Sequence, residues 1–168
     1  MPNPRQTRLL TDYQKVQQLI AESGGALRLV RATGSPPTTY VIEYNCPSLV
    51  KDGEHIAIRR QHRVEIKLAP NHPFNMPTAR MLTSVFNPHV FFTQAFCLGG
   101  YWSPVETLDT LVLRIGAILQ WDPKVINLRS LANLEAGEWA RKNPSQLPLP
   151  GAVQFKAAKK AGPGIQWS

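Results

Sequence analysis

Residues 108–119 constrain the fold most, because their apolar side chains recur with the period of an α-helix. Steps of three and four residues place these side chains on one face of a helix. Two starts are open for this helix, Ser103 followed by Pro104, or Thr107, and Asp122 ends it just before a proline. The apolar positions are Leu108, Leu111, Val112, Ile115, Ile118 and Leu119.

Four runs before this helix are predicted to be β-strands, at residues 26–31, 38–44, 62–68 and 80–86. The third run alternates strictly, with Val64, Ile66 and Leu68 on one face and charged residues on the other. Residues 34–37, Gly-Ser-Pro-Pro, are typical of a turn and predict a hairpin between the first two strands. We interpret the stretch that contains Asp52-Gly53 as a polar connection between the second and third strands.

Two further helices complete the predicted architecture, at residues 9–20 and residues 130–142. Gly137 weakens the second of them by about 1 kcal/mol relative to alanine. We therefore expect one α+β domain over residues 1–143, with an N-terminal helix, a four-stranded antiparallel meander, a central helix on the sheet and a short C-terminal helix. Residues 144–168 are rich in proline, glycine and lysine and are predicted to form a flexible basic tail.

The composition bounds the class of protein. With 168 residues, 43% of them hydrophobic, the chain fits a single domain with a real core. The sequence has no apolar run of about 18 residues and no secretory signal, so we expect a cytoplasmic protein with no membrane partner. The formal charge of +8 suggests an acidic partner, either protein or nucleic acid, although it could also serve solubility alone.

The two cysteines are too few for a disulfide framework, and a cytoplasmic pair is normally reduced. Cys46 precedes a proline at the end of a predicted strand, so we interpret it as structural. Cys97 lies in a loop between predicted elements, where chemistry is often placed, although a lone cysteine is more often silent. No cofactor or metal is predicted. The histidines at 55, 62 and 72 lack the paired short spacings of zinc ligands.

Five short motifs surround Cys97 in a fixed order. They are His72-Pro73-Phe74-Asn75-Met76-Pro77, Asn87-Pro88-His89, Cys97-Leu98, Trp102-Ser103-Pro104 and Asp122-Pro123. Through them, residues 9–143 resemble ubiquitin-conjugating enzymes. The resemblance implies that family's α+β fold and an acyl transferase with Cys97 as its nucleophile. Cys97 would accept a ubiquitin-like modifier from an activating enzyme as a thioester and pass it to an amine of a target protein.

The resemblance implies roles for further residues. The tripeptide is reversed, so Asn87 stands at the family's histidine and His89 at its asparagine, which orders the loop and supports the oxyanion. His89 could donate a hydrogen bond there, or it could be a loop residue without a catalytic part. Asn127 stands near a common aspartate of the family and could orient the incoming amine. The predicted catalytic set is Cys97, His89, Asn87 and Asn127.

The resemblance also implies two contact surfaces for partner proteins. Arg5, Arg8 and Lys15 form a basic face that would meet the activating enzyme, although it could equally be a solvated face. A ligase-like partner, if one exists, would bind at Phe74, Asn75 and Met76 in the first proline loop.

The chain is abbreviated relative to eukaryotic members of the family. Only four residues separate Cys97 from Trp102, and one predicted helix follows Asp122-Pro123 in place of two. In this it resembles the bacterial branch of the family. Members of that branch are encoded in operons with a ubiquitin-like modifier, its activating enzyme and its deconjugating enzyme, and they are linked to defence against phage.

Two other functions stay open at this point. The first is a catalytically inactive module of the same fold that binds the modifier, which the reversed tripeptide favours. The second is a basic nucleic-acid-binding domain, motivated by the charge. It is disfavoured because aromatic residues do not interleave with the basic ones, and Glu65 partly balances Arg63 and Lys67.

Overall fold

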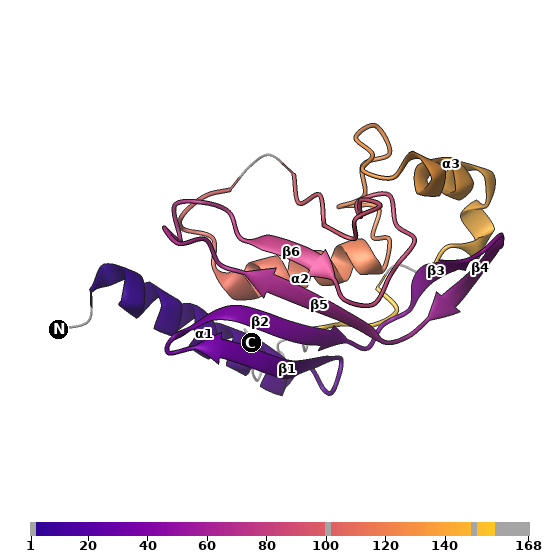
Figure 1. Cartoon of the computed structure of the whole chain (residues 1–168). Coiled ribbons are helices and arrows are strands. Elements are labelled where there is room, and N and C mark those ends of the chain that lie inside the picture. The colour runs from indigo at the N-terminus through magenta and orange to yellow at the C-terminus, as the bar shows by residue number, and fades with distance from the viewer. Residues whose placement is uncertain (1–2, 100–101, 149–150, 157–168) are drawn as a thin grey trace, which may run out of the picture.

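A long N-terminal helix, six strands and two later helices make up the part of the chain that the computed structural model describes, residues 3–99, 102–148 and 151–156. Figure 1 shows their arrangement. The bounds are α1 Pro4–Glu22, β1 Leu27–Gly34, β2 Pro37–Tyr44, β3 Ser48–Asp52, β4 His55–Arg59, β5 His62–Lys67, β6 Thr78–Met81, α2 Leu108–Leu119, α3 Leu134–Lys142 and the 3₁₀ turn η1 Pro144–Gln146.

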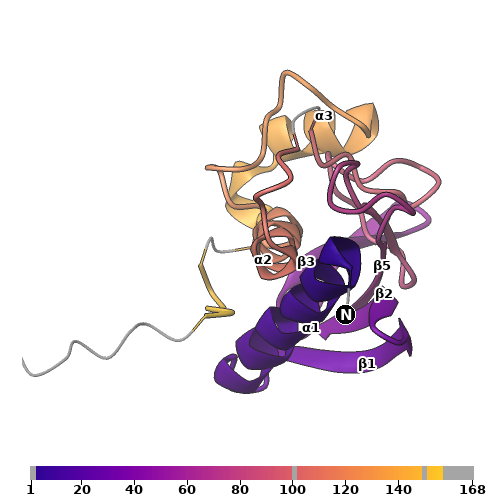
Figure 2. The same cartoon turned by 90° about the vertical axis from the view of Figure 1, so that its left-hand side faces the viewer.

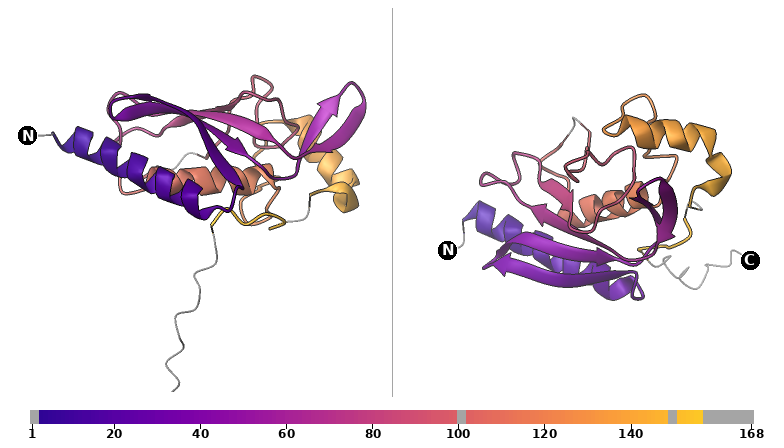
Figure 3. Two further views of the ribbon diagram at one scale, coloured as in Figure 1. Left: turned by 90° about the horizontal axis from the view of Figure 1, so that it is seen from below. Right: turned by 45° about the vertical axis from the view of Figure 1, so that its right-hand side comes forward.

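The central element is a four-stranded antiparallel sheet with the strand order β1-β2-β5-β6. Its register pairs Ile42 with Val64 and Val64 with Met81. Both α1 and α2 lie against one face of this sheet (Figures 2 and 3). The predicted α+β fold with its four-stranded meander is therefore confirmed. Among the described residues, no helix is long and apolar enough to cross a membrane.

The helix α1 starts earlier than the predicted residue 9. The side chain of Asn3 accepts a hydrogen bond from the Gln6 amide at 2.8 Å, and Pro4 occupies the first helical turn, where its missing N–H is not needed. Leu9, Val16 and Leu19 are buried beneath the sheet, as the helical period requires.

The prediction of a plain polar connection at residues 45–61 was wrong, because β3 and β4 form a hairpin there. The signal was present in the sequence. Apolar residues at 49, 50, 56 and 58 flank an Asp-Gly pair, the strongest short-range indication of a hairpin. Gly53 adopts the left-handed backbone with φ +58° that such a turn needs. The hairpin extends away from the sheet toward α3 (Figure 1).

Two predicted element bounds also differ from the structure. The fourth strand of the sheet is Thr78–Met81, not residues 80–86, because the Phe86 amide leaves the sheet and donates to the Leu49 carbonyl at 2.8 Å. The last helix starts at Leu134, not at residue 130, because Asn133 caps it by accepting from the Ala136 amide at 3.0 Å. Tertiary contacts therefore set both bounds.

The main core lies between the sheet and the two helices and includes part of the predicted tail. The hydroxyl of Tyr44 donates to the Val112 carbonyl at 2.8 Å, which ties the sheet to α2. Phe155 is buried edge-on against Tyr44 and over Gly116, where a Cβ atom would stand only 2.4 Å from the phenyl ring. The described residues 151–156 thus pack on the domain, and residues 157–168 lie outside the described residues. The division of the chain at residue 143 stays a prediction.

Candidate active site

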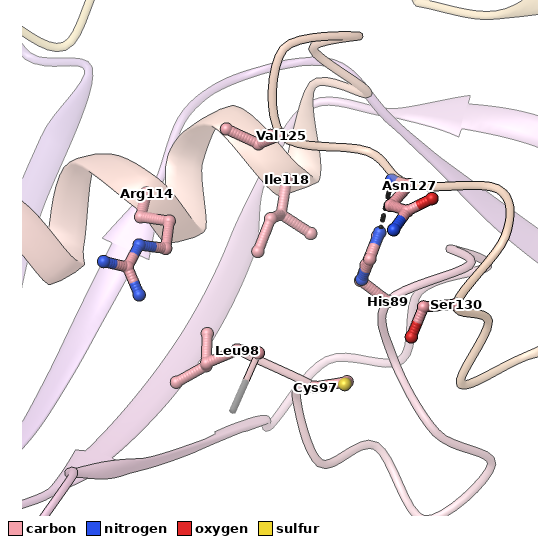
Figure 4. A pocket seen from close by; sticks show the side chains of 9 residues that line it. His89, Cys97, Leu98, Arg114, Ile118, Val125, Asn127 and Ser130 are labelled. Atoms are coloured by element: carbon pink, nitrogen blue, oxygen red, sulfur yellow. Dashed lines mark hydrogen bonds between the residues drawn. The ribbon is translucent and has the colours of Figure 1, made fainter. Parts of the chain in front are cut away.

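Cys97 stands in the long loop between β6 and α2, next to a cavity of about 200 Å³. Its amide donates to the His89 carbonyl at 2.8 Å, and Val90 bridges to Phe96, so a tight turn places His89 beside the cysteine. The thiol-bearing residue is partly exposed. The described residues that line the cavity are His89, Cys97, Leu98, Gly99, Arg114, Ile118, Val125, Asn127 and Ser130 (Figure 4).

Asn87 is placed behind the site rather than in it. Its side chain is fully buried, its Nδ2 donates to the Ile118 carbonyl at 2.8 Å, and its Oδ1 accepts from the His89 amide at 2.9 Å. One residue thus joins the end of α2 to the turn that carries His89. Asn87 does not line the cavity, so its geometry is that of a positioning residue.

His89 lies in the wall of the cavity, and its ring is held through one of its two nitrogens. Its Nε2 accepts from the Asn127 amide at 2.9 Å, so the ring proton sits on Nδ1. Burial lowers the pKa of His89, while a hydrogen bond to the backbone of Cys97 acts in the opposite direction and raises it. The imidazole is therefore neutral near pH 7, with its one N–H on Nδ1.

The loop after α2 forms the opposite wall and rests on the reversed tripeptide. The Pro88 carbonyl accepts from the amides of Ala132 at 2.8 Å and Asn133 at 3.1 Å. Asn127 lines the cavity, as expected of a site residue, and its Oδ1 accepts from the Arg129 amide at 2.9 Å. The side-chain Nδ2 of Asn127 and the hydroxyl of Ser130 are hydrogen-bond donors at the cavity. They could play the part that the resemblance gave to His89.

Two of the described cavity residues with polar side chains, Ser130 and Arg114, were not predicted as site residues. Ser130 follows Asn127 by three residues and is joined to it by a backbone turn, with its amide 3.2 Å from the Asn127 carbonyl. Arg114 belongs to α2, where its Nη2 donates to Glu106 at 2.9 Å. The only indication of Arg114 in the sequence was that it is a charged residue one helical turn before Ile118. Nothing in the sequence shows that this position faces the cavity beside Cys97.

A buried carboxylate holds the other end of α2. Asp12 is fully buried and accepts from Arg8 Nε at 3.0 Å, His72 Nε2 at 2.7 Å and the Leu108 amide at 3.1 Å. The last of these bonds caps the helix, whose N-cap residue is Thr107, the second of the two predicted starts. No local motif announces this contact between α1, the first proline loop and α2.

The expected basic face on α1 is smaller than predicted. The guanidinium of Arg8 faces inward, where it also donates to the carbonyls of Pro104 and Glu106, and its side chain is only 18% exposed. Lys15 is exposed, as a contact face would require. The inclusion of Arg8 in that face was therefore wrong, because a nearby buried carboxylate recruits it.

The first proline loop is joined to the loop that follows the cysteine. Trp102 Nε1 donates to the Pro73 carbonyl at 2.7 Å, and the His72–Pro73 peptide is cis. The ring of Phe74 is 72% exposed at the tip of the proline loop. The loop therefore packs on the domain while its aromatic residue remains at the surface.

The two cysteines have different environments. Cys46 is 1% exposed, and burial raises the pKa of its thiol to about 12, which keeps it protonated and unreactive. Cys97 is partly exposed beside hydrogen-bond donors. Among the described residues, no group of three or more histidine, cysteine or acidic side chains is arranged to hold a metal ion. Of the two thiols, only Cys97 is placed for chemistry.

Known proteins support the resemblance at low sequence identity. The chain is 26% identical over 113 residues to a ubiquitin-conjugating enzyme, E2-34 kDa, of Saccharomyces cerevisiae, a match that covers 58% of this chain and 37% of the yeast protein. It is 33% identical over 63 residues to human ubiquitin-conjugating enzyme E2 K, covering 35% of this chain and 32% of the human protein. The matches thus span about a third of each relative. No family model matches.

Solved structures show the same fold over most of the chain. A ubiquitin-conjugating enzyme domain of Toxoplasma gondii superposes with a TM-score of 0.60 and 22% identity, over 84% of this chain and 89% of that domain. A putative ubiquitin-conjugating enzyme of Trypanosoma cruzi superposes with a TM-score of 0.62 and 16% identity, over 86% and 94% of the two chains. The chain is therefore E2-like: it has the fold of ubiquitin-conjugating enzymes and is distantly similar to them in sequence.

Within the described part of this E2-like protein, one helix and one 3₁₀ turn follow Asp122-Pro123. Asp122 itself accepts from the Lys124 amide at 2.9 Å, so its carboxylate closes the turn after α2. This agrees with its expected role at the helix end.

Proposed function

We propose that this E2-like protein carries a ubiquitin-like modifier on Cys97 and transfers it to an amine. The observation that supports this most is the placement of Cys97, a partly exposed thiol on the rim of a cavity, on the fold of ubiquitin-conjugating enzymes. Both walls of that cavity are anchored, one through the His89 turn and the other through the loop on Pro88. A thiol held in this way is presented in a fixed place.

In the first step, the thiolate of Cys97 attacks the carbonyl carbon of the thioester between the modifier and its activating enzyme. A new C–S bond forms to Cys97, and the thiol of the activating enzyme leaves. A free thiol with a pKa of about 8.5 is ionised only to a few per cent at neutral pH, but the thiolate is a strong nucleophile. The step therefore needs no dedicated base, and the neutral His89 need not act as one.

In the second step, the amine attacks the same carbonyl and an oxyanion develops. The amide nitrogen of Asn127 and the hydroxyl of Ser130 are donors at the cavity that could stabilise it. Because no carboxylate is among the described lining residues, the amine must arrive neutral or lose its proton to water. His89 contributes by holding Asn127 and the backbone of Cys97 in place.

The binding-module alternative is supported by one observation. Because His89 Nε2 already accepts from the Asn127 backbone amide, only its Nδ1–H remains as the side-chain donor that the resemblance led us to expect at this position. A module that only binds the modifier would tolerate this arrangement. The presence of Cys97 beside the cavity favours the enzyme.

A charging assay separates the two functions. The protein is incubated with its cognate activating enzyme, modifier and ATP and then analysed on a non-reducing gel. We expect an adduct that is lost on adding a thiol reductant and is absent from Cys97→Ala, and a reductant-resistant ester with Cys97→Ser. If the activating enzyme becomes charged but no adduct forms on this protein, the enzyme function is wrong, and modifier binding to Cys97→Ala then tests the binding module.

For the biological setting, we propose a bacterial anti-phage conjugation pathway in the cytoplasm. The support is the abbreviated sequence, with four residues between Cys97 and Trp102 and, in the part of the chain that the structure describes, a single α-helix after Asp122-Pro123. The test is the efficiency of phage plating on bacteria that express the native operon, intact or with Cys97→Ala. Equal plating on both strains would contradict this role while leaving the chemistry at Cys97 untouched.

A further inference from the structure

The cavity beside Cys97 has two chemically different ends (Figure 4). Cys97, Asn127 and Ser130 lie at one end, where the hydrogen-bond donors gather. Arg114 lies at the other end. The waist between them is apolar and is formed by Leu98, Ile118 and Val125. A ligand that reaches Cys97 through this cavity therefore passes from a positive group over an apolar surface to the thiol.

Arg114 is the only charged side chain among the described residues that line the cavity, because His89 is neutral. It is 27% exposed, and its hydrogen bond to Glu106 uses one of its two terminal nitrogens. A guanidinium has five N–H donors arranged as a planar fork. The remaining donors form no hydrogen bond to any described residue, so the group can still bind a carboxylate.

The position of Arg114 fits the length of a peptide tail. Arg114 and Ile118 are one helical turn apart, about 6 Å along the axis. An extended peptide covers about 3.3 Å per residue, so about two of its residues span the distance from Ile118 to Arg114. The residues at its carboxyl end lie between Ile118 and the thiol. A modifier whose last residue is joined to Cys97 would place a residue about three to five from its carboxyl end beside Arg114.

We propose that Arg114 is a specificity residue that selects modifiers with an acidic side chain in this part of the carboxyl-terminal tail. The inference rests on the proposed thioester function of Cys97. A carboxylate can form a charge-assisted bidentate pair with the guanidinium, whereas a lysine or arginine there would be repelled. Lys124 and Arg129 lie in the loop after α2, which forms the opposite wall of the cavity, and they add to the positive electrostatic potential there. The preference for an acidic tail therefore does not depend on the contact with Arg114 alone.

The proposal can be tested without the natural modifier. The probes are six-residue peptides that end in Gly-Gly and carry a mercaptoethanesulfonate thioester at the carboxyl end. They differ only at the third and fourth residues from that end, which are both aspartate, both alanine or both lysine. Cys97 attacks the thioester carbonyl, the new C–S bond forms, and mercaptoethanesulfonate leaves with the thiol proton. Intact-mass spectrometry measures the initial rate of acylation.

We expect the aspartate peptide to acylate the wild-type protein about tenfold faster than the lysine peptide, as one charge-assisted pair allows. Raising the salt concentration should shrink this ratio. In Arg114→Gln the ratio should fall to within about twofold of unity. The paired exchange Glu106→Arg with Arg114→Glu keeps the ion pair and should favour the lysine peptide. The matched control is Lys124→Gln, which lowers the net charge by one, as Arg114→Gln does, at an exposed position outside the cavity lining, and it should keep most of the preference.

The outcomes separate this inference from the function on which it rests. Equal rates for all three peptides on the wild-type protein, or a preference that survives Arg114→Gln, would overturn the role of Arg114. Such a result would leave the charging assay with the activating enzyme unaffected. If Cys97→Ala is acylated as fast as the wild type, the thiol is not the acceptor, and both proposals fail. Circular dichroism of each variant checks that it is folded.

Discussion

The two ends of α2 are held by opposite kinds of polar group. At its N-terminus, the carboxylate of Asp12 accepts from the Leu108 amide, and at its C-terminus, the amide of Asn87 donates to the Ile118 carbonyl. Each group matches the partial charge of its helix end, positive at the N-terminus and negative at the C-terminus. Both groups are fully buried, and both come from other parts of the chain.

The two ends of α2 differ in the other hydrogen-bond partners of Asp12 and Asn87. Asp12 also binds Arg8 and His72, and Arg8 reaches the backbone of the loop that leads from the cysteine into α2. Asn87 binds only neutral groups and leads through His89 to the loop after α2. The segment that carries Cys97 is thus anchored by an ionic network on one side and a neutral one on the other. A substitution in the ionic anchor should reduce the free energy of unfolding more than one in the neutral anchor, because it leaves buried charged or polar groups without a partner.

Asp12→Ala tests this comparison with the largest expected effect. It removes the acceptor of three donors and leaves His72 and the Leu108 amide buried without a partner. We expect the free energy of unfolding to fall by about 3–5 kcal/mol, measured by urea denaturation. Asp12→Asn, which keeps the size and one carbonyl oxygen, should lose less. A loss no greater than that of the Asn87 variants would break the comparison.

Asn87→Ala should destabilise by about 2 kcal/mol, because it leaves the Ile118 carbonyl and the His89 amide unpaired. Asn87→Asp is the sharper variant. A carboxylate cannot donate to the carbonyl and puts a negative charge at a helix C-terminus, so it should cost at least as much as alanine. If Asn87→Asp were as stable as the wild type, the match between group and helix end would be incidental.

Arg8→Lys should cost about 1 kcal/mol, since it keeps a positive charge near Asp12 but loses the planar fork that also reaches two backbone carbonyls. Hydrogen exchange of the backbone at residues 103–108 should increase in this variant. The matched control is Lys15→Ala on the exposed face of the same helix, expected within about 0.5 kcal/mol of the wild type. Equal exchange in the two variants would show that Arg8 does not hold the loop.

The pH dependence should give the smallest effect and test the neutral end. Burial lowers the pKa of His89 below 6.5 in the folded protein, so the unfolded chain binds more protons in acid. Stability should therefore be full above about pH 6.5 and decrease as the pH falls toward the folded pKa. His89→Gln, whose carbonyl can still accept from Asn127, should reduce this decrease. It should not abolish it, because burial also lowers the pKa of His62. An unchanged slope in His89→Gln would contradict a buried neutral imidazole.

Several elements were predictable from local patterns. The period of three and four residues located α2, and strict alternation located β5, with Val64 and Ile66 buried as expected. The β3–β4 hairpin was equally legible, and our prediction missed it by giving its Asp-Gly turn no weight. The start of α2 was ambiguous because its capping carboxylate belongs to a residue 96 positions earlier, which no local pattern can indicate.

The candidate site, too, was only partly predictable from the sequence. Short motifs were enough to single out Cys97 and His89, and the family resemblance added Asn127; these three residues line one cavity. They were not enough to show which atoms of His89 are already bonded, that Asn87 faces away from the cavity, or that Ser130 and Arg114 face into it. Those facts depend on how the loop after α2 folds back onto Pro88.

The amino-acid sequence by itself determined the order of elements, the buried face of each and the cysteine around which the motifs gather. A residue's apolar or polar character repeats with the geometry of its own helix or strand, so this information is local. Tertiary structure alone decided the partner of each buried polar atom, and with it the capping of α2, the inward turn of Arg8 and the charge at the far end of the cavity. A hydrogen bond depends on a distance of about 3 Å in space, and residues far apart in the sequence satisfy it only once the chain has packed.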